Sequence, residues 1–149
     1  RICTFWRADP RKALRMFACL RFRLSREWYA LPVEHVIEVV SLVAITPLPE
    51  AEPHQLGAIT VRGQTVTVID LRPLLGHTQH PLKLTTPLII LRMDGSAPIA
   101  VLVDEVDNVV DLPNELEVPA NISRLLAGIT RYDESVHLVL NVDMLAGVA

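Results

Sequence analysis

Histidine and cysteine side chains are the first candidates for chemistry in this chain of 149 residues. His77 and His80 are three residues apart and could begin a metal site, but no nearby carboxylate or cysteine completes one. Cys3 and Cys19 form no Cys-x-x-Cys motif, so neither a zinc site nor a disulfide framework is indicated. The sequence therefore predicts no metal, no cofactor and a reduced protein.

A cluster of acidic residues is the second candidate for a site. It comprises Asp104, Glu105, Asp107 and Asp111, and it lacks the D-x-D-x-D-G spacing of a calcium loop. On a strand its members would point to two different faces, so they would not converge on one cation. We interpret the cluster as a solvated strand edge that discourages aggregation.

The sequence motifs of common enzymes are absent. No G-x-G-x-x-G, G-x-x-x-x-G-K-[ST] or G-x-S-x-G pattern occurs, so neither a phosphate cradle nor a nucleophile elbow is indicated. The scattered His35, His54 and His137 are expected to be surface or structural residues. We therefore predict a non-enzymatic protein; the contrary hypothesis, a small β-barrel enzyme or ligand-binding protein, requires a deep polar pocket near His77, His80 or a cysteine.

Charge and hydropathy narrow the partners of the chain. The net charge of −3 gives no nucleic-acid footprint, and the longest apolar runs are far shorter than the roughly 20 residues that span a bilayer. We expect a cytoplasmic protein without direct membrane insertion. Residues 1–24 hold seven basic residues and one acid, so this basic segment is expected to pack on the acidic body or to contact an acidic partner or membrane surface.

The beginning of the chain reads as a separate segment. Residue 1 is Arg rather than Met, which suggests a trimmed chain or a piece of a longer one. Asp9 and Pro10 suit the N-cap and first turn of a short helix. We predict a basic leader or linker over residues 1–15 and a single domain over residues 16–149.

Short strands dominate the predicted domain. Ala18, Leu20, Phe22 and Leu24 alternate with polar residues and predict a strand, and residues 28–31 suit a hairpin partner. A helical turn running into a strand is expected over residues 33–43. Gly57 is expected to open a second hairpin over residues 58–69, with Arg62 and Gly63 at its tip. Asp70–Gly76 reads as a cap, one helical turn and a stop.

The second half has a similar pattern of short strands and turns, although no exact sequence repeat occurs. Strands are predicted over residues 87–93, 97–103 and 104–112, a helical turn over 122–126, and a closing hairpin over 127–141 with a short terminal helix after it. Roughly ten short strands with a turn every ten or so residues predict an all-β sandwich or barrel with few short helices.

These segments occur in a specific order. They read LRFRL from Leu20, WYALP from Trp28, VEHVIEVV from Val33, LP at Leu48, GAITVRGQTVTVIDLRPLLG from Gly57, PIAVLVDEVDNVVDL from Pro98, AGI from Ala127 and HLVLNVDMLA from His137. With this series over most of residues 19–145, the chain resembles the CheW-like family of chemotaxis coupling proteins. The block from Gly57 to Gly76 is its most specific part.

The resemblance implies a fold, a function and a surface. The fold is two small SH3-like β-barrels packed together with a hydrophobic groove between them. The function is that of a non-enzymatic adaptor that couples chemoreceptor cytoplasmic tips to the regulatory domain of a CheA-type histidine kinase, at membrane-associated receptor arrays. The alternative is a CheW-like interaction domain of a larger protein that docks an array-localisation or pilus-motility partner.

The resemblance also implies which residues contact partners. They are Val36, Glu38, Gly57, Arg62 and Gly63. Val36 offers an apolar contact, Gly57 permits close backbone approach, and Arg62 presents a forked donor at a turn. For each residue a purely structural role stays open: Val36 in the core, Gly57 and Gly63 in backbone turns, and Arg62 in an ion pair with Asp70.

Overall fold

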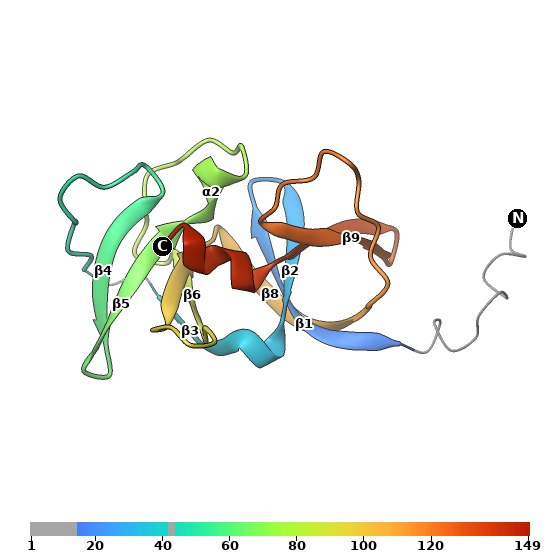
Figure 1. Ribbon diagram of the computed structural model, residues 1–149, viewed down its shortest axis with the longest axis horizontal. Helices are drawn as coiled ribbons and strands as arrows, with labels where there is room; N and C mark the ends of the chain where they lie inside the picture. The colour runs from blue at the N-terminus through green and yellow to red at the C-terminus, as the bar shows by residue number, and fades with distance from the viewer. Residues whose placement is uncertain (1–14, 42–43) are drawn as a thin grey trace, which may run out of the picture.

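The computed structural model describes residues 15–41 and 44–149 (Figure 1). The helix predicted at Asp9 lies outside these residues, and so does Cys3. The division into a leader and a domain at residue 16 therefore stays a prediction. Within the part of the chain that the structure describes, no helix has the length and apolar character needed to cross a membrane.

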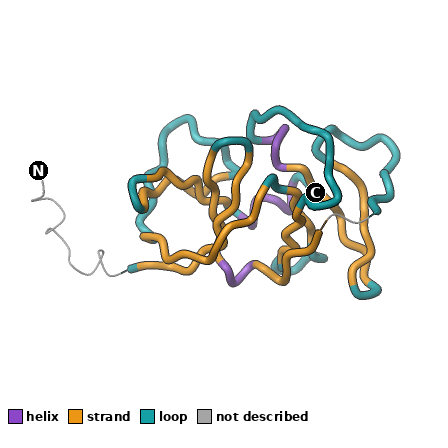
Figure 2. The backbone as a smooth tube through the Cα atoms, turned by 180° about the vertical axis from the view of Figure 1, so that it is seen from behind, coloured by secondary structure: helices purple, strands orange, loops and turns teal. Residues whose placement is uncertain are grey.

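The fold class predicted from the sequence is confirmed, because the strands form two five-stranded sheets (Figures 1 and 2). The first sheet, here called barrel 1, has the strand order β8-β1-β2-β10-β9. Hairpins join β1 to β2 and β9 to β10, β2 runs parallel to β10, and β8 pairs with β1. Its strands are β1 (Met16–Leu24), β2 (Glu27–Pro32), β8 (Glu105–Pro113), β9 (Leu126–Tyr132) and β10 (Ser135–Leu140).

The second sheet, barrel 2, has the order β3-β6-β7-β5-β4. Hairpins join β4 to β5 and β6 to β7, β5 runs parallel to β7, and β3 pairs with β6. The predicted cap at Asp70 is confirmed, because its side chain accepts a hydrogen bond from the Arg72 amide at the start of the short helix α2. The elements are β3 (Val36–Ser41), β4 (Gln55–Val61), β5 (Gln64–Asp70), α2 (Leu71–Leu74), β6 (Pro87–Leu91) and β7 (Ile99–Leu102).

The two barrels have the same topology in a permuted chain order. The strands β3, β4, β5, β6 and β7 correspond in position to β8, β9, β10, β1 and β2. Residues 46–76 and 117–147 align without a gap: the isolated bridge Thr46–Ala58 matches Glu117–Ile129, and Gly57 matches Gly128. The chain crosses between barrels twice, through the 3-10 turn η2 (Val33–His35) and between β7 and β8.

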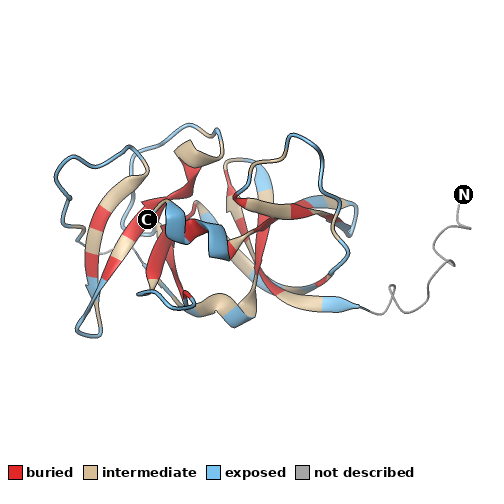
Figure 3. Ribbon diagram, in the orientation of Figure 1, coloured by how far each residue is buried: buried red, intermediate tan, exposed pale blue. Residues whose placement is uncertain are grey.

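Three apolar clusters hold this arrangement together. The largest lies between the barrels and draws residues from both sheets, including Phe22, Tyr29, Ile69 and Leu91 (Figure 3). The 3-10 segment η3 (Val142–Gly147) adds Val142 and Leu145 to it. Smaller clusters fill barrel 2 and barrel 1 separately. Burial of apolar surface at the junction is thus the main force that joins the barrels.

Two local predictions were wrong. The helical turn predicted over residues 122–126 is absent, because Leu126 begins β9 opposite Leu140 and Leu125 is buried in the central cluster. Gly57 does not open its strand, because β4 begins at Gln55, with an irregularity in pairing between residues 55 and 57. In both places tertiary pairing, which local pattern does not encode, decided the boundary.

Candidate protein-interaction surface

The tip of the β4–β5 hairpin presents one exposed arginine. Arg62 and Gly63 both have positive φ, at 51° and 77°, the pattern of a type I′ turn that matches the twist of the flanking strands. The Arg62 side chain is 80% exposed. The turn chemistry read from the sequence therefore places this guanidinium at the outer end of barrel 2.

Arg62 pairs with Glu38 of β3. Its Nε and Nη2 atoms donate to Glu38 Oε2 at 3.1 and 2.6 Å. The predicted pairing of Arg62 with Asp70 was wrong: Asp70 is buried at the other end of β5, where it pairs with Arg72. The structure thus joins two of the predicted partner-binding residues, the exposed Arg62 and the partly buried Glu38, into one charge pair.

Strand β3 also carries exposed apolar side chains, on the face opposite to Glu38. Ile37 and Val39 flank Glu38 in sequence and are 43% and 42% exposed. Val36 is only partly exposed and packs against the central cluster. Sequence reasoning selected Val36 and missed Ile37 and Val39, although the alternation of side chains along V-I-E-V-V indicated that these two share a face. Any apolar contact with a partner on this strand falls first to Ile37 and Val39.

Gly57 has a structural task. A Cβ atom there would lie 2.1 Å from the Thr46 carbonyl oxygen, and its φ of +137° disfavours other residues. The close approach allows the bridge in which Thr46 and Ala58 exchange backbone hydrogen bonds. Gly57 is buried and pairs with Val68, whereas the tip of the hairpin pairs Val61 with Gln64. It therefore lies apart from Arg62, while Gly63 lies beside it.

His77 and Cys19, two of the candidates for chemistry, are built into the fold. His77 Nε2 is 2.8 Å from the Tyr29 hydroxyl oxygen, a hydrogen bond between the barrels. Cys19 is buried, and burial raises the pKa of its thiol to about 12, so it is an inert thiol at neutral pH. Among the described residues no group of three potential metal ligands is found.

Three members of the acidic cluster lie on β8, an edge strand as predicted, and Asp104 precedes it. Most of the members are paired rather than merely solvated. Glu105 pairs with Arg23, and Asp107 with Arg21, across the β1–β8 ladder. The hydrogen bond from Arg21 lowers the pKa of Asp107. These pairs give β8 cross-strand stabilisation in addition to discouraging edge-to-edge contacts.

Two shallow clefts lie on barrel 1, and neither is lined by the predicted partner-binding residues. One is lined by Arg26, Glu27 and Trp28 of the β1–β2 hairpin and by three residues of β10. The other lies where η2, β9 and η3 meet, and its lining includes Phe17, Leu116 and Val142. The predicted surface is therefore the exposed face of β3 with the hairpin tip, rather than a closed pocket.

Comparison with known proteins places the chain among close structural relatives. A family model described as CheW-like domain matches residues 18–148. The chemotaxis protein CheW of Thermotoga maritima is 26% identical over 138 residues, which cover 88% of each chain. The crystal structure of the scaffolding protein TtCheW from Thermoanaerobacter tengcongensis has a TM-score of 0.79 and 27% identity, covering 88% of this chain and 92% of that chain.

Proposed function

The chain belongs to the CheW-like domain family of chemotaxis coupling adaptors, and from that premise we propose that it links a chemoreceptor's cytoplasmic tip to the regulatory domain of a CheA-type histidine kinase. The family is one of non-enzymatic scaffolds, so the work of the domain is to bind. We place this binding at membrane-associated receptor arrays. The observation that carries the proposal is the pair of Glu38 with the exposed Arg62, together with the exposed Ile37 and Val39 on the opposite face of the same edge strand.

This surface combines the two features that protein partners use. An exposed guanidinium at a rigid turn can exchange its carboxylate for one from a partner, because an arginine fork binds carboxylates in a defined geometry. Ile37 and Val39 add apolar area on a strand that is held in place by β6. Because β3 is an edge strand, a partner that covers this edge would meet both of its faces, bury Ile37 and Val39 and desolvate the ion pair, which favours specific binding over non-specific adhesion.

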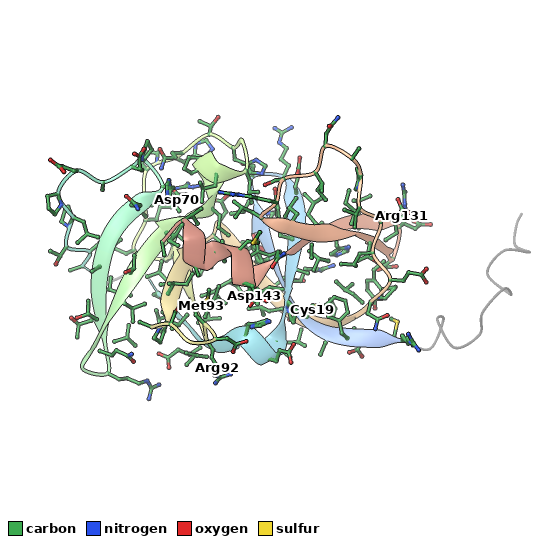
Figure 4. All side chains as sticks on the ribbon, in the orientation of Figure 1. Cys19, Asp70, Arg92, Met93, Arg131 and Asp143 are labelled. Atoms are coloured by element: carbon green, nitrogen blue, oxygen red, sulfur yellow. The ribbon has the colours of Figure 1, made fainter. Side chains whose placement is uncertain are left out.

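Titration of the purified domain tests the proposal. One set of titrations uses the regulatory domain of a CheA-type kinase and another uses a chemoreceptor cytoplasmic tip, each with the wild type, Arg62→Ala and Val39→Asp. Val39 is the better apolar site to change than Val36, because Val36 packs against the core and its loss would confuse binding with folding. Arg131→Ala is the matched control: Arg131 is an exposed arginine on β9 of barrel 1, away from β3 (Figure 4).

The expected result is a loss of affinity of at least about tenfold, or about 1.4 kcal/mol, for Arg62→Ala and Val39→Asp with at least one partner. Arg131→Ala should bind as the wild type does. The free energy of unfolding should change by less than about 1 kcal/mol in Arg62→Ala, because Arg62 is exposed. Failure of the folded wild type to bind either partner would contradict the proposal and favour a role in docking an array-localisation or pilus-motility protein.

A further inference from the structure

Each of the two chain crossings between the barrels is contacted by an arginine of barrel 2. At the first crossing, the Arg92 amide donates to the His35 carbonyl at 2.7 Å, and Arg92 Nη1 donates to the Glu34 carbonyl at 2.8 Å. At the second crossing, between β7 and β8, the contact is made by Arg72 of α2. Figure 4 shows Arg92 near the lower end of the junction and Asp70, the partner of Arg72, near its upper end.

Arg72 is held rigidly on the barrel 2 side. Its side chain is 3% exposed, and Nε and Nη2 donate to Asp70 Oδ1 and Oδ2, both at 2.9 Å. Asp70 is fully buried, and its carboxylate also accepts from the Arg72 amide and from Gln79 Nε2, each at 3.0 Å. The hydrogen bonds from the guanidinium to Asp70 raise the pKa of Arg72, so the guanidinium stays charged. A planar fork that is fixed on one side can aim its remaining nitrogen in one direction only.

That remaining nitrogen points at the crossing. Arg72 Nη1 lies 3.5 Å from Asp104 Oδ1, and Asp104 Oδ2 accepts a hydrogen bond from the Ser25 amide at 2.6 Å. Ser25 belongs to the turn of the β1–β2 hairpin, and the Asp104 amide in turn donates to the carbonyl of Arg23 in β1 at 3.0 Å. One carboxylate therefore connects the buried charge of barrel 2 to the hairpin of barrel 1.

Other directional contacts across the junction are hydrogen bonds that involve no pair of charged side chains, such as His77 to the Tyr29 hydroxyl and Arg92 to the Glu34 carbonyl. The central cluster supplies most of the adhesion, but burial of apolar surface depends little on direction. The residue of barrel 1 that aligns with Arg72 is Asp143 of η3, which is exposed and has no such network among the described residues. The charge network occurs once, at the place where the chain leaves barrel 2 for barrel 1.

We propose that Arg72 and Asp104 are positioning residues that fix the orientation of barrel 1 relative to barrel 2. The inference rests on the proposed function in one respect: a partner that contacts both barrels recognises their mutual orientation as well as the side chains of β3. Loss of the Asp104 charge should leave both barrels folded, because Asp104 lies between strands and each barrel keeps its own cluster.

Residual dipolar couplings of the backbone amides test the orientation directly. Couplings from both barrels fit a single alignment tensor on the wild-type coordinates when the relative orientation is kept, whereas a changed orientation gives two tensors with different axes when the barrels are fitted separately. The variant is Asp104→Asn, which keeps a side-chain acceptor for Ser25 but removes the charge opposite Arg72. The matched control is Glu105→Gln, which removes the same charge one residue later from a pair that lies within barrel 1.

We expect one tensor for the wild type and for Glu105→Gln, and two for Asp104→Asn. Arg72→Lys is the second variant and should also give two tensors, because an ammonium cannot fork to Asp70 and reach Asp104 as well. A single tensor with unchanged orientation in both variants would overturn the inference. If the tensors separate but the kinase and receptor titrations are unchanged, the positioning role stands and the contact of one partner with both barrels is disproved.

Discussion

The interiors of the two barrels differ although their strands are arranged alike. The apolar cluster inside barrel 2 is aliphatic. Barrel 1 has a small apolar cluster of Cys19, Ala30 and Leu112, and beyond it the same faces of the strands carry polar groups. These residues are Arg21, Trp28, Thr130 and His137. Arg21 pairs with Asp107, and its Cζ atom lies 4.2 Å from the centroid of the Trp28 ring.

The difference teaches how one topology can be stabilised in two ways. Barrel 2 can rely on its own apolar packing, whereas barrel 1 combines ion pairs, a cation–π contact and its share of the central cluster. The exposed apolar residues of β3 belong to barrel 2, which has the larger apolar cluster of its own. A surface exposed for binding is best supported by a scaffold that does not depend on it for stability.

The largest expected effect comes from the matched glycines of the two barrels. Gly57→Ala should lower the free energy of unfolding by about 4 kcal/mol or more, because positive φ alone costs about 1–3 kcal/mol and the new Cβ would meet the Thr46 carbonyl at 2.1 Å. Gly128→Ala should cost less, because its Cβ would meet the Leu116 Cβ at 2.6 Å and its φ is not positive. Urea denaturation of both variants measures the difference, and equal losses would show that the two bridges are equivalent.

Truncation of one leucine in each interior tests the comparison itself. Leu88→Ala in barrel 2 should lower the free energy of unfolding by about 3 kcal/mol, because Leu88 is fully buried in the aliphatic interior. Leu112→Ala in barrel 1 should lower the free energy of unfolding by less, because fewer apolar side chains surround Leu112 and fewer packing contacts are lost. Chemical denaturation reports both values. A larger loss for Leu112→Ala would mean that barrel 1 depends more on apolar packing than its composition indicates.

The smallest expected effect is a pH dependence that arises in barrel 1. His137 is fully buried, its Nδ1 lies 3.3 Å from the Ser135 carbonyl oxygen, and its Nε2 has no hydrogen-bond partner in the described chain. Burial lowers the pKa of His137, the hydrogen bond to Ser135 opposes part of this, and the positive charge of Arg21 adds to the lowering. Thr130 lies opposite on β9, and the Tyr132 ring contacts the imidazole edge-on, so neither supplies a negative charge.

Because the native pKa of His137 lies below that of the unfolded chain, the unfolded state binds more protons below about pH 6.5. The free energy of unfolding should therefore fall as the pH drops through that value, by at most about 1.4 kcal/mol per pH unit for one proton. The aligned residue in barrel 2 is Val66, so His137→Val is the control that removes the titrating group and matches the other interior. Denaturation at pH 7.5 and pH 5.5 should show a smaller decrease in the variant; an equal decrease would assign the effect to other groups.

Much of the local structure could be predicted because it depends on neighbouring residues. The Arg-Gly tip of the β4–β5 hairpin follows from turn chemistry, the Asp70 cap from the residues after it, and the first hairpin from strict alternation. The sequence also indicated that the two halves are similar in pattern, but the alignment of Gly57 with Gly128 became clear only from the structure.

The candidate surface could be predicted only in part. Arg62 and Glu38 were both selected, but as separate residues, and their contact joins a hairpin turn to a strand 24 positions away in sequence. The predicted partner of Arg62 was wrong, because the alternation of β5 gave no measure of which end of the strand is buried. Ile37 and Val39 are exposed whereas Val36 is partly buried. The sequence could not show this difference, because exposure depends on which distant segments pack against β3.

The sequence by itself determined the all-β class, the positions of the turns and the family of the chain, because alternation, turn residues and motif order are short-range properties. The tertiary structure alone decided the permuted strand order, the polar interior of barrel 1 and the network of Asp70, Arg72 and Asp104. Those features depend on which distant segments share one low-dielectric interior, where a charge must find its partner across the fold rather than along the chain.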